Sequence, residues 1–178
     1  MLRLFVGIEF PPELKLRLSL LETGIAGAKW VDPGNLHLTL RFIGEVDEGM
    51  AADIDEALAR LRARRFTLLL AGTGVFGGNR PHVLWAGVER DPELWALRDK
   101  IEQTLIRLGL EPEGRKFAPH VTLARLRDPE LVALGNFLAA NARFRAAPLR
   151  VEQFSLIASY PTKSGSIYED QADYPLYG

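Results

Sequence analysis

The sequence predicts an α+β fold in two similar lobes, each an antiparallel or mixed sheet with helices on its outer face. Segments typical of strands and of helices alternate along all 178 residues, and no low-complexity linker divides them. Two of the strand segments carry one motif, His-x-Thr-Leu, at His37 and at His120, 83 positions apart. This repetition indicates a duplicated unit, so we expect one bilobal domain over residues 1–178 whose central cleft carries both motifs.

The first third of the chain predicts strands separated by two helices. Its opening segment combines β-branched and aromatic side chains, as strands do. Pro11 and Pro12 suit the first turn of a helix, and Gly24 suits its end. The second helix has acidic residues first and arginines last, which complements the helix dipole. In order, the predicted elements are a strand over 2–10, a helix over 11–24, strands over 29–32 and 35–46, and a helix over 47–65.

The rest of the chain continues this alternation. Two helices begin with the triplet Asp-Pro-Glu, at Asp91 and at Asp128, where the aspartate can cap the helix and the proline can take its first position. A glycine-rich connection is expected between the two strands that precede the first of these helices. In order, the predicted elements are strands over 66–72 and 82–89, a helix over 91–110, a strand over 115–126, a helix over 128–142, and strands over 150–161 and 166–177 joined by the turn 162–165.

The composition is that of a soluble globular protein, with 47% hydrophobic and 25% charged residues. The absence of cysteine excludes a disulfide framework, a thiol nucleophile and a thiolate zinc site. The formal net charge of -1 gives no global basic field for nucleic acid, but it is compatible with a locally basic cleft. Glu9 and two prolines interrupt the N-terminal apolar run, so we expect a first strand and no signal peptide. The expected protein is monomeric and cytoplasmic, with no membrane segment.

The two motifs have the composition of an acid–base site. Side chains alternate along a strand, so His37 and Thr39 share one face, and His120 and Thr122 share another. One neutral imidazole can take a proton from an attacking oxygen, and one protonated imidazole can give a proton to a leaving oxygen. Threonine hydroxyls can donate to the oxygens of a phosphodiester as charge develops there. The basic residues just beyond the motifs, which could add charge-assisted contacts, are Arg41 and Arg125.

Other readings of these residues compete with this one. A single His-x-Thr occurs readily on any half-exposed strand, but two of the three histidines matching the longer motif is roughly a 10⁻⁴ event by chance. His37, His82 and His120 could instead form a three-histidine zinc site, although the paired threonines would then have no role. The segment "GTGVFG" over 72–77 lacks the helix that a dinucleotide fingerprint requires, which favours a loop or hairpin. The basic run over 60–65 is expected to be a solvated helix end.

"HLTLRFIGEV" and "FAPHVTL" resemble the two signatures of the two-histidine (2H) phosphoesterases. Within that superfamily the chain is most similar to the RNA 2′,3′-cyclic phosphodiesterases, historically called 2′-5′ RNA ligases. The opening "RLFVGIE", the approach "WVDPGNLHLTL", the strand "RPHVLWAG" and the block "FAPHVTLAR" carry this resemblance, which covers nearly the whole chain. The family often has a different basic residue at the position of His82, which is therefore expected to be a strand residue at the cleft edge.

The resemblance implies hydrolysis of a ribose 2′,3′-cyclic phosphate to a 2′-phosphate, with no cofactor and no metal. His37 would donate a proton to the leaving 3′ oxygen, and His120 would activate water. Thr39 and Thr122 would hold the phosphate, and Arg125 matches a basic residue of the family's site. Because strict alternation places Arg125 on the face opposite His120, a bulge or strand end is needed there. The implied partners are RNA 3′ ends or nucleotides that carry a 2′,3′-cyclic phosphate.

Three alternatives stay open. The same proton transfers in reverse would give a 2′-5′ RNA ligase, the enzyme could prefer other cyclic or 2′-5′-linked phosphodiesters, and a cleft that only binds RNA ends would be a non-catalytic module. The residues themselves do not say which imidazole is the acid and which the base, since that assignment comes from the family. Contacts to ribose and base, such as Tyr168 in the loosely matching C-terminal segment, are also left unassigned.

Overall fold

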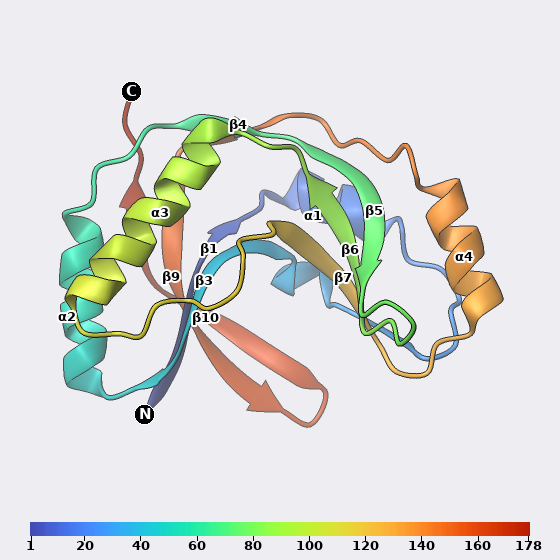
Figure 1. The fold of residues 1–178 in the computed structure, drawn as a ribbon, viewed down its shortest axis with the longest axis horizontal. Helices are drawn as coiled ribbons and strands as arrows, with labels where there is room; N and C mark the ends of the chain where they lie inside the picture. Colours follow the sequence, from blue (N-terminus) through green and yellow to red (C-terminus); the bar gives the residue numbers. More distant parts are fainter.

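Two four-stranded antiparallel sheets and four α-helices make up the molecule, and the computed structural model describes all 178 residues (Figure 1). The strands are β1 Leu2–Glu9, β2 Ala28–Trp30, β3 His37–Val46, β4 Phe66–Leu68, β5 Leu70–Phe76, β6 Val83–Val88, β7 His120–Leu126, β8 Leu149–Val151, β9 Gln153–Thr162 and β10 Gly165–Pro175. The helices are α1 Pro12–Ser19, α2 Glu48–Ala59, α3 Pro92–Arg107 and α4 Leu131–Ala140, with a short 3-10 helix, η1, at Pro33–Asn35.

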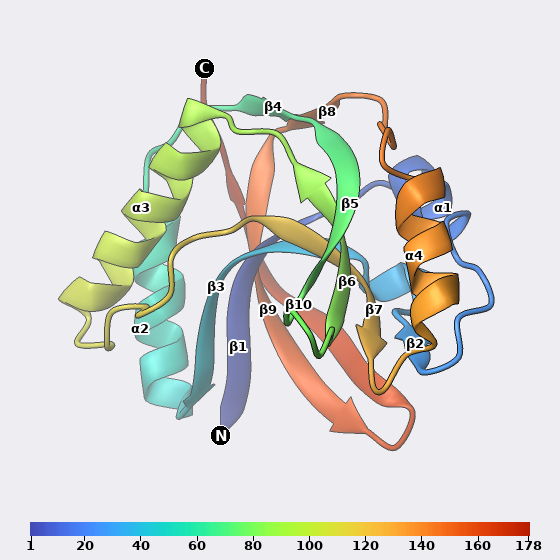
Figure 2. The same cartoon turned by 45° about the vertical axis from the view of Figure 1, so that its right-hand side comes forward.

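The sheets divide the molecule into the two predicted lobes. The first sheet has the order β10-β9-β1-β3, the second has the order β2-β7-β6-β5, and β4 pairs with β8 in a small third sheet. β3 and β7, the strands that carry the motifs, contact each other between the lobes. Figures 1 and 2 show α2 and α3 beside each other next to the first sheet, and α4 at the opposite end of the molecule. None of the helices combines the length and apolar character that crossing a membrane requires.

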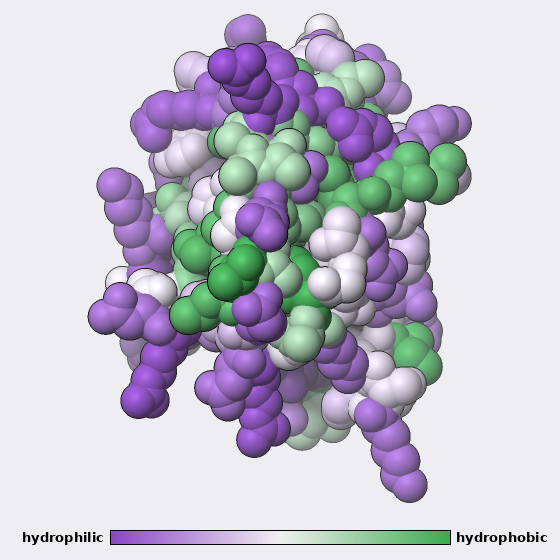
Figure 3. Space-filling model, turned by 90° about the vertical axis from the view of Figure 1, so that its right-hand side faces the viewer, coloured by the Kyte–Doolittle hydropathy of each residue, from purple (hydrophilic) through white to green (hydrophobic).

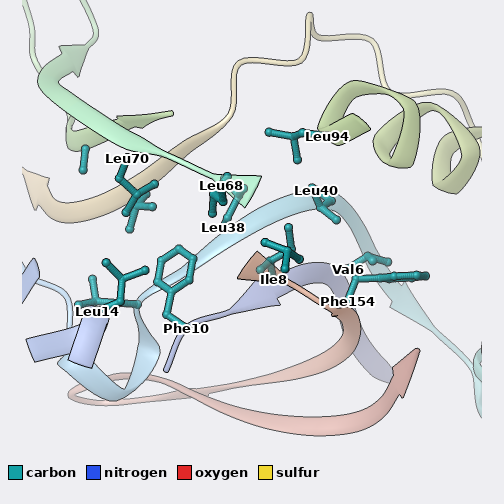
Figure 4. Close-up of a cluster of buried hydrophobic side chains, with 14 of the residues drawn as sticks. Val6, Ile8, Phe10, Leu14, Leu38, Leu40, Leu68, Leu70, Leu94 and Phe154 are labelled. Atoms are coloured by element: carbon teal, nitrogen blue, oxygen red, sulfur yellow. The ribbon is translucent and has the colours of Figure 1, made fainter. Parts of the chain in front are cut away.

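One cluster of 38 buried apolar side chains joins the two lobes. Figure 4 shows its centre, where side chains from β1 and β3 lie opposite leucines from β4, β5 and α3. Leu38 and Leu40 of β3 are 0% and 3% exposed, and Val121 and Leu123 of β7 are also 0% and 3% exposed. The apolar residues of each motif therefore fasten their strand to the core, which leaves the histidine and threonine on the other face.

All four helices end earlier than predicted, and α2 and α1 differ most. α2 ends at Ala59, because the backbone of the following residues pairs with the C-terminal segment: Tyr177 donates to Ala63 O, and Arg65 donates to Tyr177 O. The basic run over 60–65 is therefore not a final helical turn, and its Arg62 lies 4.4 Å above the Tyr177 ring. α1 ends at Ser19, after which i→i−3 hydrogen bonds tighten the chain before Gly24 is reached.

The two Asp-Pro-Glu triplets behave differently. Asp91 caps α3 as predicted, accepting from the backbone of Glu93 and Leu94. At the second triplet the cap is Glu130, and Asp128 adopts a left-handed φ of 44°. The reason is tertiary, because Glu130 donates its backbone N–H to Ala26 O and so holds the chain extended until α4 begins. Figure 3 shows that apolar side chains gather over this end of the molecule, where Leu131 and Val132 of α4 are 64% and 69% exposed.

The glycine-rich stretch over 72–77 is mostly strand, where the sequence favoured a loop or hairpin. Residues 72–76 belong to β5, and the reversal into β6 comes only at Gly77, whose φ is 114°. A β-carbon on Gly77 would lie 2.5 Å from His82 Nδ1, so the turn requires glycine there. No helix begins at these glycines, so the stretch has no dinucleotide fingerprint.

Candidate active site

The two motif histidines line one cleft. His37 begins β3, His120 begins β7, and both face a cavity of about 1060 Å³ between the lobes. Thr39 and Thr122 line the same cavity, two residues along each strand. The structure therefore brings together the two imidazoles and two hydroxyls that the sequence paired.

Each motif strand contains a bulge at the same place. On β3 the register with β1 passes from Thr39 to Arg41, which leaves Leu40 without a partner. On β7 the register with β6 passes from Thr122 to Ala124, which leaves Leu123 without a partner. In both strands the extra residue is the third after the histidine. A bulge of one residue shifts the alternation, so the side chains directly after it point to the face opposite the one expected.

The bulges decide which basic residue reaches the cleft. The residue five after each histidine returns to the histidine's face, and on β7 this residue is Arg125, which lines the cavity. The bulge that strict alternation required for Arg125 is therefore present. The corresponding residue on β3 is Phe42, which is 58% exposed and lines the same cavity.

Arg41 lies four residues after its histidine and has a different environment from the one expected. Its side chain is 8% exposed and its Nε lies 3.1 Å from a carboxylate oxygen of Glu102, while Arg98 pairs with the same carboxylate at 3.1 Å. Arg41 also donates to the backbone carbonyl oxygens of Phe42 and Glu111. Arg41 also lines the cavity, but these partners occupy its guanidinium, so the phosphate contact expected for Arg41 stays a prediction.

Both imidazoles are oriented by the same backbone contact. Nδ1 of His37 lies 2.7 Å from Asn35 O, and Nδ1 of His120 lies 2.8 Å from Ala118 O. A carbonyl oxygen only accepts, so Nδ1 is the protonated nitrogen in each ring and Nε2 is the one that exchanges a proton. Nε2 of His37 lies 2.8 Å from the Thr39 hydroxyl.

Burial and nearby charge lower the pKa of both histidines. Desolvation is the main cause for His37, and the charges of His120, Lys15 and Arg125 act in the same direction, against the hydrogen bond to Asn35. Desolvation also lowers the pKa of His120, with a further contribution from Arg125. Arg125 contributes to both shifts, which agrees with its place in the lining of the cavity.

Aromatic rings and a glycine fix the position of His37. Its ring centroid lies 4.9 Å from that of Phe5 and 5.2 Å from that of Tyr168, which it meets edge-on. A β-carbon on Gly7 would lie 2.8 Å from Leu38 O and 3.6 Å from Cδ2 of His37, so glycine lets the ring lie close to β1. His120 has one such neighbour, Phe76, at 4.8 Å.

His82 lies at the cleft edge but does not complete a metal site. It immediately precedes β6 and lines the cavity. The three histidines do not converge, since the one group of three potential ligating side chains within 4.8 Å of one another is Glu9, Asp170 and Asp173, all exposed. Three-histidine zinc coordination is therefore not formed by this fold.

The cleft is basic even though the whole chain is slightly acidic. Six lysines and arginines line it, against two acidic residues, Asp32 and Glu113. Sequence reasoning missed two of these lining residues, Phe42 and Lys29, and left Tyr168 without a role. The apolar pair after the threonine in "HVTLAR" breaks the alternation where the β7 bulge occurs and was an available signal for Arg125, whereas "HLTLRF" contains no such pair to indicate Phe42.

Comparison with known proteins places this geometry in a family. The sequence model described as LigT like Phosphoesterase matches residues 8–85 and 88–168. The RNA 2′,3′-cyclic phosphodiesterase of Aeropyrum pernix is 41% identical over 158 residues, which are 87% of this chain and 89% of that protein. The RNA 2′,3′-cyclic phosphodiesterase of Archaeoglobus fulgidus is 32% identical over 175 residues, covering 95% and 97% of the two chains.

A solved structure agrees over the full length. The crystal structure of E. coli LigT complexed with 3′-AMP superposes with a TM-score of 0.80 at 27% sequence identity, covering 99% of each chain. The match includes both lobes and hence both motif strands.

Proposed function

Because this chain belongs to the LigT-like phosphoesterase family, we propose that its cleft catalyses the RNA 2′,3′-cyclic phosphodiesterase reaction by two-histidine acid–base chemistry. The enzyme is a phosphodiester hydrolase that opens a ribose 2′,3′-cyclic phosphate. The observation that carries the mechanism is the pair of His-x-Thr strands with equivalent bulges, facing one basic cavity. The substrates are RNA 3′ ends or nucleotides with a 2′,3′-cyclic phosphate, and the 3′-AMP bound by E. coli LigT supports a nucleotide in this cleft.

Two proton transfers accompany the reaction. Neutral His120 takes a proton from water at Nε2 while the water oxygen attacks phosphorus. The bond from phosphorus to the 3′ oxygen breaks, and protonated His37 gives its proton to that oxygen. The products are a 2′-phosphate and a 3′ hydroxyl, and exchange with solvent restores the starting protonation of the two rings. The shared Nδ1–H contacts to backbone carbonyls keep Nε2 available in both steps.

Three side chains act on the phosphate. The hydroxyls of Thr39 and Thr122 donate to the non-bridging oxygens, and Arg125 supplies a positive charge on the same face. The lowered pKa of His37 disfavours its protonated form in the empty cleft. A bound phosphodiester anion counteracts this by favouring the charged imidazole, so substrate binding and protonation of His37 support each other.

The test is turnover of adenosine 2′,3′-cyclic phosphate, with the product isomer identified by ³¹P NMR. We expect 2′-AMP, because the 3′ bond breaks. A 3′-AMP product would mean that the bond to the 2′ oxygen breaks and would contradict the proposed reaction, and tight binding without turnover would favour a non-catalytic module. We also expect unchanged activity in EDTA, whereas activity lost in EDTA and restored by zinc would contradict the metal-free mechanism.

A further inference from the structure

Lys29 lies directly beside Arg125 on the neighbouring strand. The short edge strand β2 pairs antiparallel with β7, and in that register Lys29 is opposite Arg125. Side chains that are opposite each other across two strands point to the same face of the sheet. Both residues accordingly line the cleft, and Lys29 is exposed.

This pair of like charges has no compensating anion in the protein. Neither Lys29 nor Arg125 takes part in an ion pair. Of the two acids in the cleft lining, Asp32 accepts from Gly34 N and Glu113 accepts from Arg115 N. Like charges directly opposite each other destabilise a sheet, so an anion bound at this position would relieve a cost that the empty protein carries.

The position of Lys29 separates it from the reacting phosphate. Arg125 lies on the strand of His120 and Thr122 and lines the same cavity, so it is placed to meet the reacting phosphate. Lys29 lies on β2, one strand further from the sheet centre than Arg125 on β7, and the axes of neighbouring strands are about 4.8 Å apart. The first sheet offers no counterpart, because β3 is its edge strand and carries Phe42 where β7 carries Arg125. On the second sheet the cationic wall of the cleft thus continues from Arg125 to Lys29, and Arg115 and Lys116 of the segment before β7 also line the cavity.

We propose that Lys29 binds the phosphate on the 5′ side of the terminal nucleotide, so that the enzyme prefers a cyclic phosphate at the end of an RNA strand to a free cyclic mononucleotide. This inference rests on the proposed function and names the substrate of the same site. A cavity of about 1060 Å³ accommodates more than one nucleotide. Phosphate contacts of this kind give affinity without reading sequence, so the preference is for strand length and not for a particular base.

The experiment compares kcat/KM for adenosine 2′,3′-cyclic phosphate and for the dinucleotide ApA that ends in a 2′,3′-cyclic phosphate. The ratio of dinucleotide to mononucleotide is measured for the wild type, Lys29→Met, Lys29→Arg and the matched control Arg150→Met. Arg150 is exposed on β8 and does not line the cleft. Methionine keeps the length of the side chain without its charge, and arginine keeps the charge.

We expect the wild-type ratio to exceed one, Lys29→Met to lower it about five- to tenfold, and Lys29→Arg and Arg150→Met to retain it. For the dinucleotide, the slope of log kcat/KM against log salt should become shallower by about 0.7 in Lys29→Met. An equal loss on both substrates would place Lys29 at the reacting phosphate and overturn the inference. An unchanged ratio would also overturn it, and would leave Lys29 as an edge-strand charge that prevents sheet pairing. If the wild type hydrolyses neither substrate, the proposed function itself fails.

Discussion

The two halves of the cleft are built alike around their histidines and differently beyond them. Each begins with a histidine whose Nδ1 contacts the carbonyl oxygen two residues earlier, continues with a threonine, and bulges at the next leucine. After the bulge the halves diverge. In the His120 half, Arg125 faces the cleft. In the His37 half, Phe42 takes the corresponding position, and Arg41 forms a buried ion pair with Glu102.

The two sides of the cleft therefore differ in polarity: one side carries cations and the other carries apolar side chains. β7 lies inside its sheet, with β2 outside it, so cations stand on two adjacent strands. β3 is an edge strand, and the residues of its sheet that line the cleft include Phe42, Ile167 and Tyr168. The duplicated motif supplies the chemistry, and the sequence beyond each bulge supplies the polarity of the cleft.

Removal of either histidine should have the largest effect. We expect His37→Ala and His120→Ala each to lower kcat for the cyclic nucleotide by about 10²–10⁴-fold, because each takes one proton transfer out of the reaction. The double variant should be little worse than either single variant if the two rings act as a unit. Circular dichroism and the melting temperature serve as folding controls. Near-normal turnover in either single variant would end the two-histidine mechanism.

Substitutions of Arg125 and Arg41 should have different effects, the first on activity and the second on stability. Arg125→Met should lower kcat/KM about tenfold with little change in melting temperature, because Arg125 is exposed and has no ion pair. Arg41→Met should lower the free energy of unfolding by about 2–3 kcal/mol, since Glu102 is buried and keeps only Arg98 as an ion-pair partner.

Denaturant unfolding and steady-state kinetics on both variants make this comparison. If Arg41→Met lowered kcat/KM as much as Arg125→Met at full stability, Arg41 would belong to the phosphate site after all.

The smallest expected effect is on pH dependence. The profile of kcat/KM reports the free enzyme, and it should be bell-shaped because one imidazole must be neutral and the other charged. The pKa of both histidines lies below the ordinary value of 6.5, so we expect the maximum on the acid side of pH 6.5. Arg125→Met removes a charge that lowers both pKa values, and its maximum should move to higher pH. A maximum that stays in place in this variant would mean that Arg125 is not close to the imidazoles.

The paired motifs, the alternation of side chains along their strands and most helices and strands could be predicted from local sequence. His-x-Thr-Leu places its leucine and threonine on opposite faces through the local geometry of a strand, whatever the partner strand is. The start of α3 at Asp91 was equally local, because an aspartate cap and a following proline act within one turn. These features need only neighbours in the chain.

The tertiary structure alone decided what lies after the motifs and beside them. A bulge is a relation between two strands, so Leu40 and Leu123 become extra residues only once β3 has paired with β1 and β7 with β6. The same pairing sends Arg41 to Glu102, 61 positions away, and brings Lys29 opposite Arg125 from the other half of the chain. Such contacts depend on register between distant segments, which no local pattern of residues specifies.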